Sequence, residues 1–476
     1  MRDILFVSIC LGLVPLFVRR PWIGILGWYG VAYFVPQGIS WGFARTFPFA
    51  MVVGSATLLG FIFTKDRKPL PRDAVTFFML ACTLQFTLTT IVAYNQDVAW
   101  VIWDRVMKIL LMTFVTMTLF QDRARLRWLY MVPALGLGFY GVKGVLWVLR
   151  TGGGGGGYTG GAAASEGGRV YGPEMAFFAD ANAIGPALCM ILPLLLYLAR
   201  EEERWWLRHI FRIAFGASIV AAIFTYSRGT FLGLAVVGLI LIWRSPWRLR
   251  FATGLLVVGI LAAPLAPQRL WERLASITQQ QSAETRDASS ASRVESFKTA
   301  WNIAVSRPFT GVGFRGLSTA EVWAIYYGSG FRGTFDPHSI YFEVLGEHGL
   351  LGFALYMGVI VSILLTLRRL RKRWRDHPEH GYLSRYAEMT QLALYPFLVS
   401  GAFVPFAVFD LYFLLVATSS MLYVLSQQAE CAEAAKVEAQ RAEAARLAPS
   451  QRRRPLAPRP APAALPTRPR QRPRHV

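Results

Sequence analysis

Charge is scarce in this chain, and cysteine and histidine are scarcer still. Of 476 residues, 16% are charged, 4 are cysteine and 6 are histidine. The cysteines lie apart, in apolar segments or in the C-terminal tail, and show the spacing of neither a disulfide framework nor a metal site: Cys10, Cys82, Cys189 and Cys431. No Asp, Glu or His cluster has metal-ligand spacing, so the sequence predicts no metal and no cofactor.

Two other common signals are missing. The run Gly152–Gly157 is not followed by Lys-Ser/Thr, so it predicts a flexible loop rather than a phosphate-binding loop. The first 18 residues lack a small-residue cleavage site and are followed by Arg19 and Arg20, so we expect this first apolar segment to be retained.

Apolar residues are abundant and occur in long runs. They make up 54% of the chain and form runs of about 15 to 25 residues, the length that crosses a bilayer as a helix. We therefore predict an all-α fold, a polytopic membrane helix bundle of about 12 transmembrane helices over residues 1–427. The predicted spans are 3–18, 21–36, 46–64, 74–94, 103–120, 127–149, 182–199, 208–225, 229–243, 250–266, 339–367 and 390–427, the last with two crossings around Asp410.

Lysine and arginine alternate between loops in a way that predicts sidedness. They collect near residues 65–72, 123–127, 200–208, 244–250 and 368–375, which marks that side as cytoplasmic. The opposite side receives two long loops, a Gly-rich loop at 150–181 and a large loop at 267–337 that contains short helices. It also receives 37–45, 95–102 and a tight turn at 227–229.

The formal net charge of +22 raises the question of nucleic acid. Residues 428–476 form an Ala/Glu-rich, helix-like stretch followed by a Pro/Arg-rich end with eight arginines and no acid after residue 450. We interpret this segment as a cytoplasmic tail, disordered at its end, that contacts anionic membrane lipid, and we favour this over binding of nucleic acid. The remaining excess is largely the loop pattern itself.

One histidine stands at the end of the large outer loop, in the string "GTFDPHSIYFEVLGEHGLLGFALY" (333–356). Asp336 and Pro337 predict a helix start, with the acid as N-cap and proline at the first helical position. His338 would then lie in the first turn, where the helix N-terminus keeps it neutral and available as a general base. The alternative is a histidine that only forms a hydrogen bond at the interface.

Further along this helix, Gly346-Glu347-His348-Gly349 predicts a kink or close helix packing rather than a second catalytic site. Glu343 and Glu347 either orient His338 or lie at a wet helix end.

Arginines on the outer side contradict the charge rule, and each needs an anionic partner. Arg228 lies in "TYSRGTFLG", Arg169 in "GGRVYGPEMAFFADANAIGPA", and Arg293 opens the segment "SRVESFKTAWNIAVSRP". In that segment Val294, Phe297, Trp301 and Ala304 or Val305 predict an amphipathic helix against the bundle. Candidates of lower rank are Arg307, Arg315 and Arg332.

Several arginines that converge on one site suit a diphosphate, because each planar guanidinium binds two oxygens and stays charged. The alternative is that each arginine separately anchors to lipid or pairs with Asp180, Asp287 or Glu295. We favour a shared site with His338.

Taken together, these strings resemble the bacterial O-antigen ligase and polymerase superfamily, and especially the O-glycosylation ligases of exosortase A-associated systems. The resemblance covers about residues 1–425. It is carried by "RPWIGILGWYGVAYFVPQGISWGFARTFPFA", "GFYGVKG", "GRVYGPEMAFFADANAIGPAL", "YSRG", "SRVESFKTAW", "GVGF" and "HSIYFEVLGEHGLLG". The glycine expansion Gly152–Gly161 departs from the family, which ranks Arg169 last among the site residues.

The resemblance implies a GT-C-like glycosyltransferase of the bacterial inner membrane with its active site facing the periplasm. The donor would be an undecaprenyl-diphosphate-linked glycan and the acceptor a hydroxyl on a protein, lipid or glycan, without a metal. Arg169, Arg228 and Arg293 would hold the diphosphate and His338 would activate the acceptor. We expect an inverting transfer.

Three other functions stay open. A polymerase of the same superfamily would join one lipid-linked glycan to another. A transporter or flippase needs ionisable residues or broken helices near the midplane, where Asp410 is the main candidate. A non-catalytic scaffold would explain the bundle, but not the grouping of His338 with arginines on one face.

Overall fold

The computed structural model describes residues 2–151, 168–244, 288–328 and 333–447, together with residues 249, 250, 253 and 271. Nearly all of the predicted span 250–266 lies outside the described residues, as do the glycine expansion Gly152–Gly161, Asp287, Arg332 and the tail after residue 447. The chain divides into two compact units, Met1–Gln427 and Gln428–Val476.

Helices and their connections make up the described residues, among which there is no strand, so the predicted all-α fold is confirmed. The α-helices are α1 (Arg2–Arg19), α2 (Pro21–Phe34), α3 (Phe49–Phe63), α4 (Ala74–Ile91), α5 (Gln96–Leu119), α6 (Arg123–Thr151), α7 (Ala181–Glu201), α8 (Trp205–Ile223), α9 (Arg228–Arg244), α12 (Ala288–Ser306), α13 (Ala320–Tyr326), α14 (Ile340–Arg373), α15 (Gly381–Ser400) and α16 (Asp410–Leu447). Four short 3₁₀ helices are η1 (Pro36–Ile39), η2 (Phe43–Arg45), η4 (Gly316–Ser318) and η5 (Gly401–Phe403).

Length and composition make this a polytopic membrane protein. Within the described residues five helices are long and apolar enough to cross a bilayer: α4, α6, α7, α8 and α14. The other predicted spans in the described part are helices too, but they are shorter, more polar or more charged. The predicted count of about 12 crossings stays a prediction. The last predicted span is interrupted between Ser400 and Asp410, as expected for two helices.

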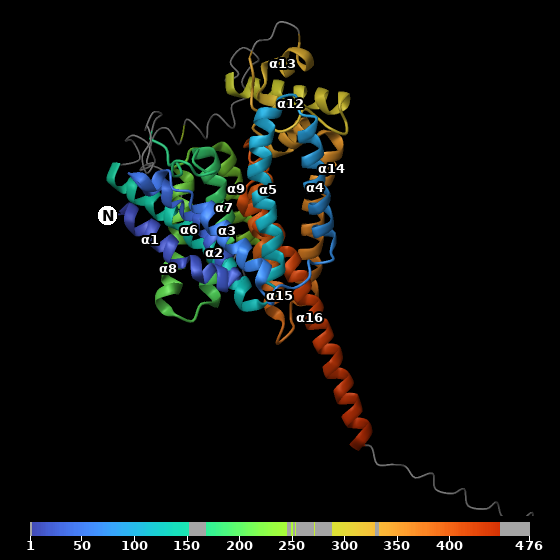
Figure 1. The fold of residues 1–476 in the computed structure, drawn as a ribbon. Coiled ribbons are helices and arrows are strands. Elements are labelled where there is room, and N and C mark those ends of the chain that lie inside the picture. The colour runs from blue at the N-terminus through green and yellow to red at the C-terminus, as the bar shows by residue number, and fades with distance from the viewer. Residues whose placement is uncertain are drawn as a thin grey trace, which may run out of the picture. The chain divides into compact units, whose positions relative to one another are not determined.

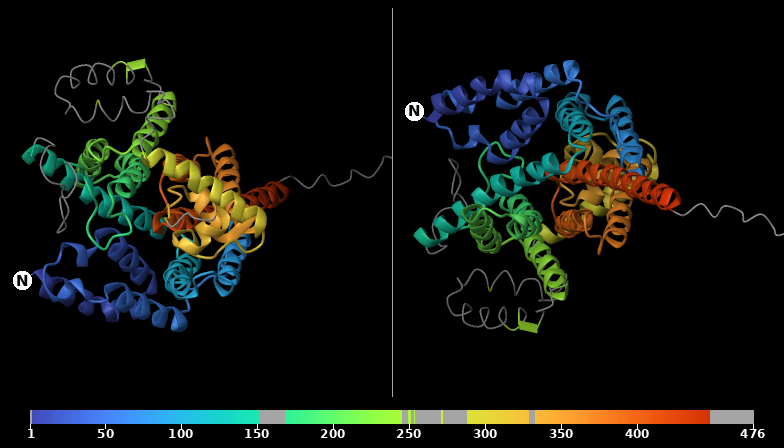
Figure 2. Two further views of the ribbon diagram at one scale, coloured as in Figure 1. Left: turned by 90° about the horizontal axis from the view of Figure 1, so that it is seen from above. Right: turned by 90° about the horizontal axis from the view of Figure 1, so that it is seen from below.

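The centre of the first unit is α7, which is buried along nearly its whole length. It packs against α6, α8, α9 and α15, while α14 packs against α4, α12 and α15. The first three helices, α1, α2 and α3, pack on one another. Their main contact with the rest of the unit is that of α2 with α6. Figure 1 shows α12 crossing the end of α14, and the left view of Figure 2 shows it from above.

The predicted kink in α14 is present, at Gly349. Its φ of 70° and ψ of −172° are not helical, and they leave backbone groups of the neighbouring turn without helical partners. The segment that follows α12 supplies those partners. Val312 N donates to Gly346 O (3.1 Å), Gly313 N donates to Glu347 O (2.8 Å), and Leu351 N donates to Pro308 O (3.0 Å). The broken helix and residues 307–313 therefore form one hydrogen-bonded unit.

The residues around the kink have structural partners. His348 is buried, its Nδ1 lies 2.7 Å from Thr89 Oγ1, and its ring packs on Phe86. Glu347 Oε1 accepts a hydrogen bond from Arg315 N (2.8 Å), and Glu343 Oε2 accepts one from Ala407 N (3.2 Å). The two glutamates thus hold loops, and of the two alternatives a wet helix end does not fit Glu347, which is buried.

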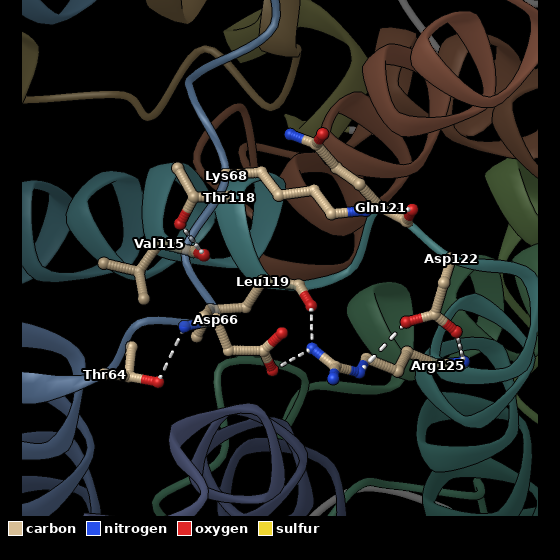
Figure 3. Close-up of polar contacts among 9 residues, drawn as sticks. All are labelled: Thr64, Asp66, Lys68, Val115, Thr118, Leu119, Gln121, Asp122 and Arg125. Carbon is tan, nitrogen blue, oxygen red and sulfur yellow. Dashed lines mark hydrogen bonds and ion pairs between the residues drawn. The ribbon is translucent and has the colours of Figure 1, made fainter. Parts of the chain in front are cut away.

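The basic connectors meet at the far end of the bundle from α12. Arg125 reaches across to Asp66 (2.6 Å) and also binds Asp122 (3.0 Å), while Lys68 Nζ donates to Gln121 O (3.3 Å), as Figure 3 shows. These contacts join the connector between α3 and α4 to that between α5 and α6. The loop charge pattern had predicted that these connectors share one side.

Substitution of Gly349 tests the dependence of the fold on the kink. A Cβ there would lie 2.6 Å from Pro308 O, and the alanine would have to adopt the positive φ of Gly349. We therefore expect Gly349→Ala to lower the free energy of unfolding by about 1 to 3 kcal/mol or more. Thermal unfolding of the detergent-purified protein measures this. Gly216→Ala, in α8 with nothing within 4 Å of its Cβ, is the matched control and should be neutral or slightly stabilising. Equal midpoints for the two variants would contradict the assignment.

Candidate active site

Arg169 is held at the corner between α8 and α9. Its Nε donates to Thr225 O (2.8 Å) and its Nη2 donates to Asn182 Oδ1 (3.0 Å) in the first turn of α7. The neighbouring Val170 N donates to Phe224 O (2.9 Å). Arg169 forms no ion pair with an acid among the described residues, so these neutral acceptors fix its position while its charge stays uncompensated by a carboxylate.

Arg228 is the first residue of α9 and is half-buried. The turn before it consists of Phe224–Ser227, with Tyr226 at a φ of 49°, so the predicted turn at 227–229 begins and ends earlier than expected. Ser400 Oγ donates to Gly229 O (2.8 Å), which fixes the start of α9 against the end of α15. Because the start of α9 is fixed in this way, the Arg228 guanidinium stays at the level of the end of α15.

Arg293 lies near the start of α12 and is half-buried, with its Nε buried and without a hydrogen-bond partner among the described residues. Burial lowers the pKa of Arg293, and the nearby charge of Arg228 lowers it further. Two guanidinium groups that repel each other in a partly desolvated place favour binding of an anion between them.

The face of α12 that packs on the bundle differs from the predicted one. Val294, Trp301 and Val305 are exposed, whereas Ala300 and Ile303 are fully buried and Phe297 stacks on Phe342 at 4.2 Å between ring centroids. The prediction of a helix against the bundle is confirmed, but the proposed contacts of Val294 and Trp301 are wrong, and of the alternatives Ala304 and Val305 it is Ala304 that is buried. Ala300 lies directly against Gly346 of α14, where a larger side chain would have no room.

His338 precedes α14 instead of lying in its first turn. The helix begins at Ile340 with Ser339 as N-cap, and His338 has a φ of 42°. The predicted N-cap role of Asp336 is wrong because its carboxylate is engaged elsewhere: Oδ1 lies 3.6 Å from Arg315 Nη1 and accepts a hydrogen bond from Ser318 Oγ at 3.1 Å. A positive φ in a non-glycine residue is a strained conformation that the surrounding contacts maintain.

The surroundings of His338 favour the neutral form of its imidazole. Burial lowers its pKa, and the charge of Arg293 lowers it further, whereas Asp336 and Asp180 act in the opposite direction. Asp180 caps α7 through Asn182 N (2.7 Å), beside the Asn182 side chain that binds Arg169. The structure therefore brings His338, Arg293 and Arg228 together, with Arg169 joined to them through the start of α7.

Of the acids named as alternative partners of the arginines, Asp287 lies outside the described residues, and Glu295 and Asp180 have other partners. Glu295 pairs with Lys298 at 3.0 Å, and the Asp180 carboxylate accepts the capping hydrogen bond of α7 from Asn182 N. Of the lower-ranked candidates, Arg315 binds Asp336, and Arg307 lies 4.9 Å from the Tyr94 ring centroid with its Nη2 on Val92 O (3.4 Å). Both hold loops in place.

Asn182 is a site residue that sequence reasoning missed. The only available signal was the Asp-Ala-Asn at the start of α7, which is an ordinary helix-capping pattern. Its role depends on the approach of Arg169 from a separate segment.

Asp410, which the transporter alternative needs, lines a cavity of about 410 Å³ at the start of α16. Asp104, Arg105 and Lys108 of α5 line the same cavity, and Lys108 pairs with Asp104 at 2.5 Å. Asp410 therefore shares its surroundings with three charged residues of α5, and its place as the main ionisable residue near the midplane stays a prediction. These charges have partners of opposite sign nearby.

Comparison with protein families gives two matches. Residues 213–357, from within α8 to within α14, match the family described as O-antigen ligase. This match supports the predicted resemblance to the O-antigen ligase superfamily. Residues 1–203 match a family of unknown function, DUF5935, and no curated protein matches the chain. The O-antigen ligase region contains Arg228, Arg293 and His338, whereas Arg169 lies in the other matched region.

This match describes the protein at a coarse level. It is a multi-pass membrane protein of the kind that carries out O-antigen ligase or polymerase-type glycan ligation, with a lipid-linked glycan donor and an acceptor.

The lowered pKa of His338 can be tested without an activity assay. The rate of reaction of the neutral imidazole with diethylpyrocarbonate, followed at His338 by peptide mass spectrometry against pH, reports its titration. Arg293→Gln removes a positive neighbour, so we expect the apparent pKa of His338 to rise. Arg307→Gln, which contacts Tyr94 and Val92 instead, should leave it unchanged. A fall in the apparent pKa of His338 in Arg293→Gln, or an equal rise of that pKa in both variants, would overturn this electrostatic assignment.

Proposed function

We propose that the protein transfers a glycan from an undecaprenyl-diphosphate-linked donor to an acceptor hydroxyl on the periplasmic side of the bacterial inner membrane. The observation that carries this proposal is the grouping of His338, Arg293 and Arg228, which come from three separate parts of the chain. Their grouping in one partly desolvated place supplies a neutral base beside fixed positive charge.

The proposed reaction is an inverting displacement at the anomeric carbon of the first donor sugar. His338 takes the proton from the acceptor hydroxyl as its oxygen forms the new glycosidic bond. The bond from the anomeric carbon to the diphosphate oxygen breaks, and the electron pair leaves with the diphosphate. Arg228, Arg293 and Arg169 stabilise the charge that develops on this leaving group, the task that a metal ion performs in other transferases.

The location of the site supports the proposed sidedness. The basic connectors gather at one end of the first unit, and His338 and its arginines belong to the connectors at the other end. Because lysine- and arginine-rich loops stay in the cytoplasm, the His338 end faces the periplasm. Acceptors consistent with this placement are surface glycans, lipids and protein hydroxyls, including those of an exosortase-associated O-glycosylation system.

Removal of the base is the first test. With the lipid-linked donor and the acceptor from the native host in proteoliposomes, we expect His338→Ala to lower the transfer rate by about 100- to 10,000-fold. Its Km for the donor should change little, because the imidazole acts on the acceptor. His209→Ala, an exposed histidine near the start of α8, is the matched control and should keep its activity. Near wild-type transfer by a folded His338→Ala protein would refute the assignment.

Removal of charge is the second test. Arg293→Gln and Arg228→Gln should each raise the Km for the donor and lower the rate by about 10- to 100-fold, because each removes a charge-assisted contact worth about 1.5 to 3 kcal/mol. Arg293→Lys should recover only part of the loss, since lysine lacks the planar fork. Full activity in 5 mM EDTA is expected for a metal-independent transfer, and loss that Mg²⁺ restores would contradict it.

A polymerase of the same superfamily is the rival within this chemistry. Mass spectrometry of surface glycoconjugates in cells with and without the gene separates the two. A ligase predicts loss of one conjugate together with accumulation of its full-length lipid-linked donor, whereas a polymerase predicts a donor shortened to single repeat units.

A further inference from the structure

The end of the bundle opposite His338 holds a second cluster of arginines. α7 runs from Asp180, beside Arg169, to Glu201, and its 21 residues span about 30 Å, the thickness of a hydrocarbon core. At its far end lies a cavity of about 840 Å³. The first turns of α6, α8 and α15 contribute to its wall, so several helix N-termini, with their positive potential, face the same region.

Five arginines and three glutamates line this cavity. Two of the glutamates are already engaged. Glu202 is buried and accepts Arg127 Nη2 at 2.6 Å, and Glu201 pairs with Arg385 at 2.8 Å. Glu202 also accepts the backbone N–H of Arg204 (3.1 Å). The carboxylates of Glu202 and Glu201 therefore neutralise Arg127 and Arg385. The charges of the other arginines of the cavity are not neutralised by these two glutamates.

Those other arginines are Arg123, Arg200 and Arg204, none of which forms an ion pair among the described residues. The guanidinium of Arg123 lies 4.4 Å from the Tyr382 ring centroid and that of Arg200 lies 5.7 Å from that of Tyr197. The Nε of Arg127 is buried without a hydrogen-bond partner in the described part of the chain. Against one remaining acid, Glu203, the cavity thus keeps an excess of positive charge.

Tryptophans place this cavity at headgroup level. Trp128 lines it and is 48% exposed, and Trp205 and Trp206, which directly follow Arg204, are 72% and 48% exposed. Exposed tryptophans at the end of a membrane helix mark the interface between hydrocarbon and headgroups. A positively charged cavity at this depth, on the side of the basic connectors, is suited to a lipid phosphate.

We propose that this cavity binds the phosphate of an anionic membrane lipid, with the headgroup on Arg123, Arg200 and Arg204 and the acyl chains along the outer faces of α6 and α8. The ligand chemistry is a phosphate ester of net negative charge. A soluble phosphate shares that chemistry, but the flanking tryptophans favour the lipid. Such a site would tie the ends of α6, α8 and α15 together in the cytoplasmic leaflet, the length of α7, about 30 Å, away from its Arg169 end.

The test compares three probes on the full-length protein in detergent: phosphatidylglycerol, phosphatidylcholine and inorganic pyrophosphate. The measured quantity is the shift of the thermal unfolding midpoint against probe concentration, which gives an apparent dissociation constant. We expect phosphatidylglycerol to stabilise the protein and phosphatidylcholine to have little effect. Stabilisation by pyrophosphate alone would overturn the lipid assignment, and equal stabilisation by both lipids would overturn recognition of charge.

The matched variants are Arg200→Gln/Arg204→Gln and Arg368→Gln/Arg369→Gln. Both remove two exposed charges from the same end of the bundle, but Arg368 and Arg369 on α14 do not line the cavity. At about fivefold per charge, we expect the first variant to weaken phosphatidylglycerol binding on the order of 25-fold and the second to leave it within about twofold. Equal losses would assign binding to diffuse surface charge and overturn the cavity site. Unchanged midpoints without lipid confirm that both variants fold.

Discussion

The contact on which this site most depends is the one between residues 307–313 and the kink of α14. A helix that breaks inside a membrane protein must find partners for its freed backbone groups, since lipid offers none. Here the amides of Val312 and Gly313 take the carbonyls of Gly346 and Glu347, and Pro308 accepts from Leu351. The same contacts fix the end of α12 and the beginning of α14 relative to each other, so that the segments carrying Arg293 and His338 are held by one hydrogen-bonded unit.

The electrostatics of the site follow from this placement. Arg293 is brought into a partly desolvated position where Arg228 already contributes charge, and its pKa is lowered by both causes. Folding thus assembles like charges instead of separating them, at a cost that the contacts at the kink and along α12 offset. Binding of an anion relieves that repulsion, and a diphosphate, with several oxygens over a short distance, relieves more of it than a single carboxylate. Burial and the same charge lower the pKa of His338, so one arrangement suits both the leaving group and the base of the proposed transfer.

Sequence patterns located most of this arrangement because the relevant signals are local or follow from membrane physics. The helices, the kink at Gly349 and the convergence of arginines on one end follow from apolar runs, paired glycines and the exception to the loop charge rule. The start of α14 was misplaced because Asp336 has two possible uses, as a cap or as a partner of Arg315 and Ser318, and the choice depends on a loop 18 to 21 residues away in sequence. The buried face of α12 was misjudged for a similar reason. Periodicity identifies an apolar stripe, but close packing on α14 selects Ala300 and Ile303 over Trp301.

The arginine clusters at the two ends of α7 differ in how their charge is balanced. At the far end, Glu201 and Glu202 neutralise Arg385 and Arg127, which joins α6, α7 and α15 and leaves a modest positive excess that a single lipid phosphate can satisfy. At the other end, Arg169 is held by a backbone carbonyl and a side-chain amide oxygen. The buried Nε of Arg293 has no hydrogen-bond partner among the described residues. Neutral acceptors fix an arginine without cancelling its charge, so the full attraction remains for a ligand. The proposed site must bind a diphosphate and release it in each turnover, which requires arginines held by neutral acceptors. A permanent lipid contact tolerates a cluster in which glutamates neutralise some of the arginines.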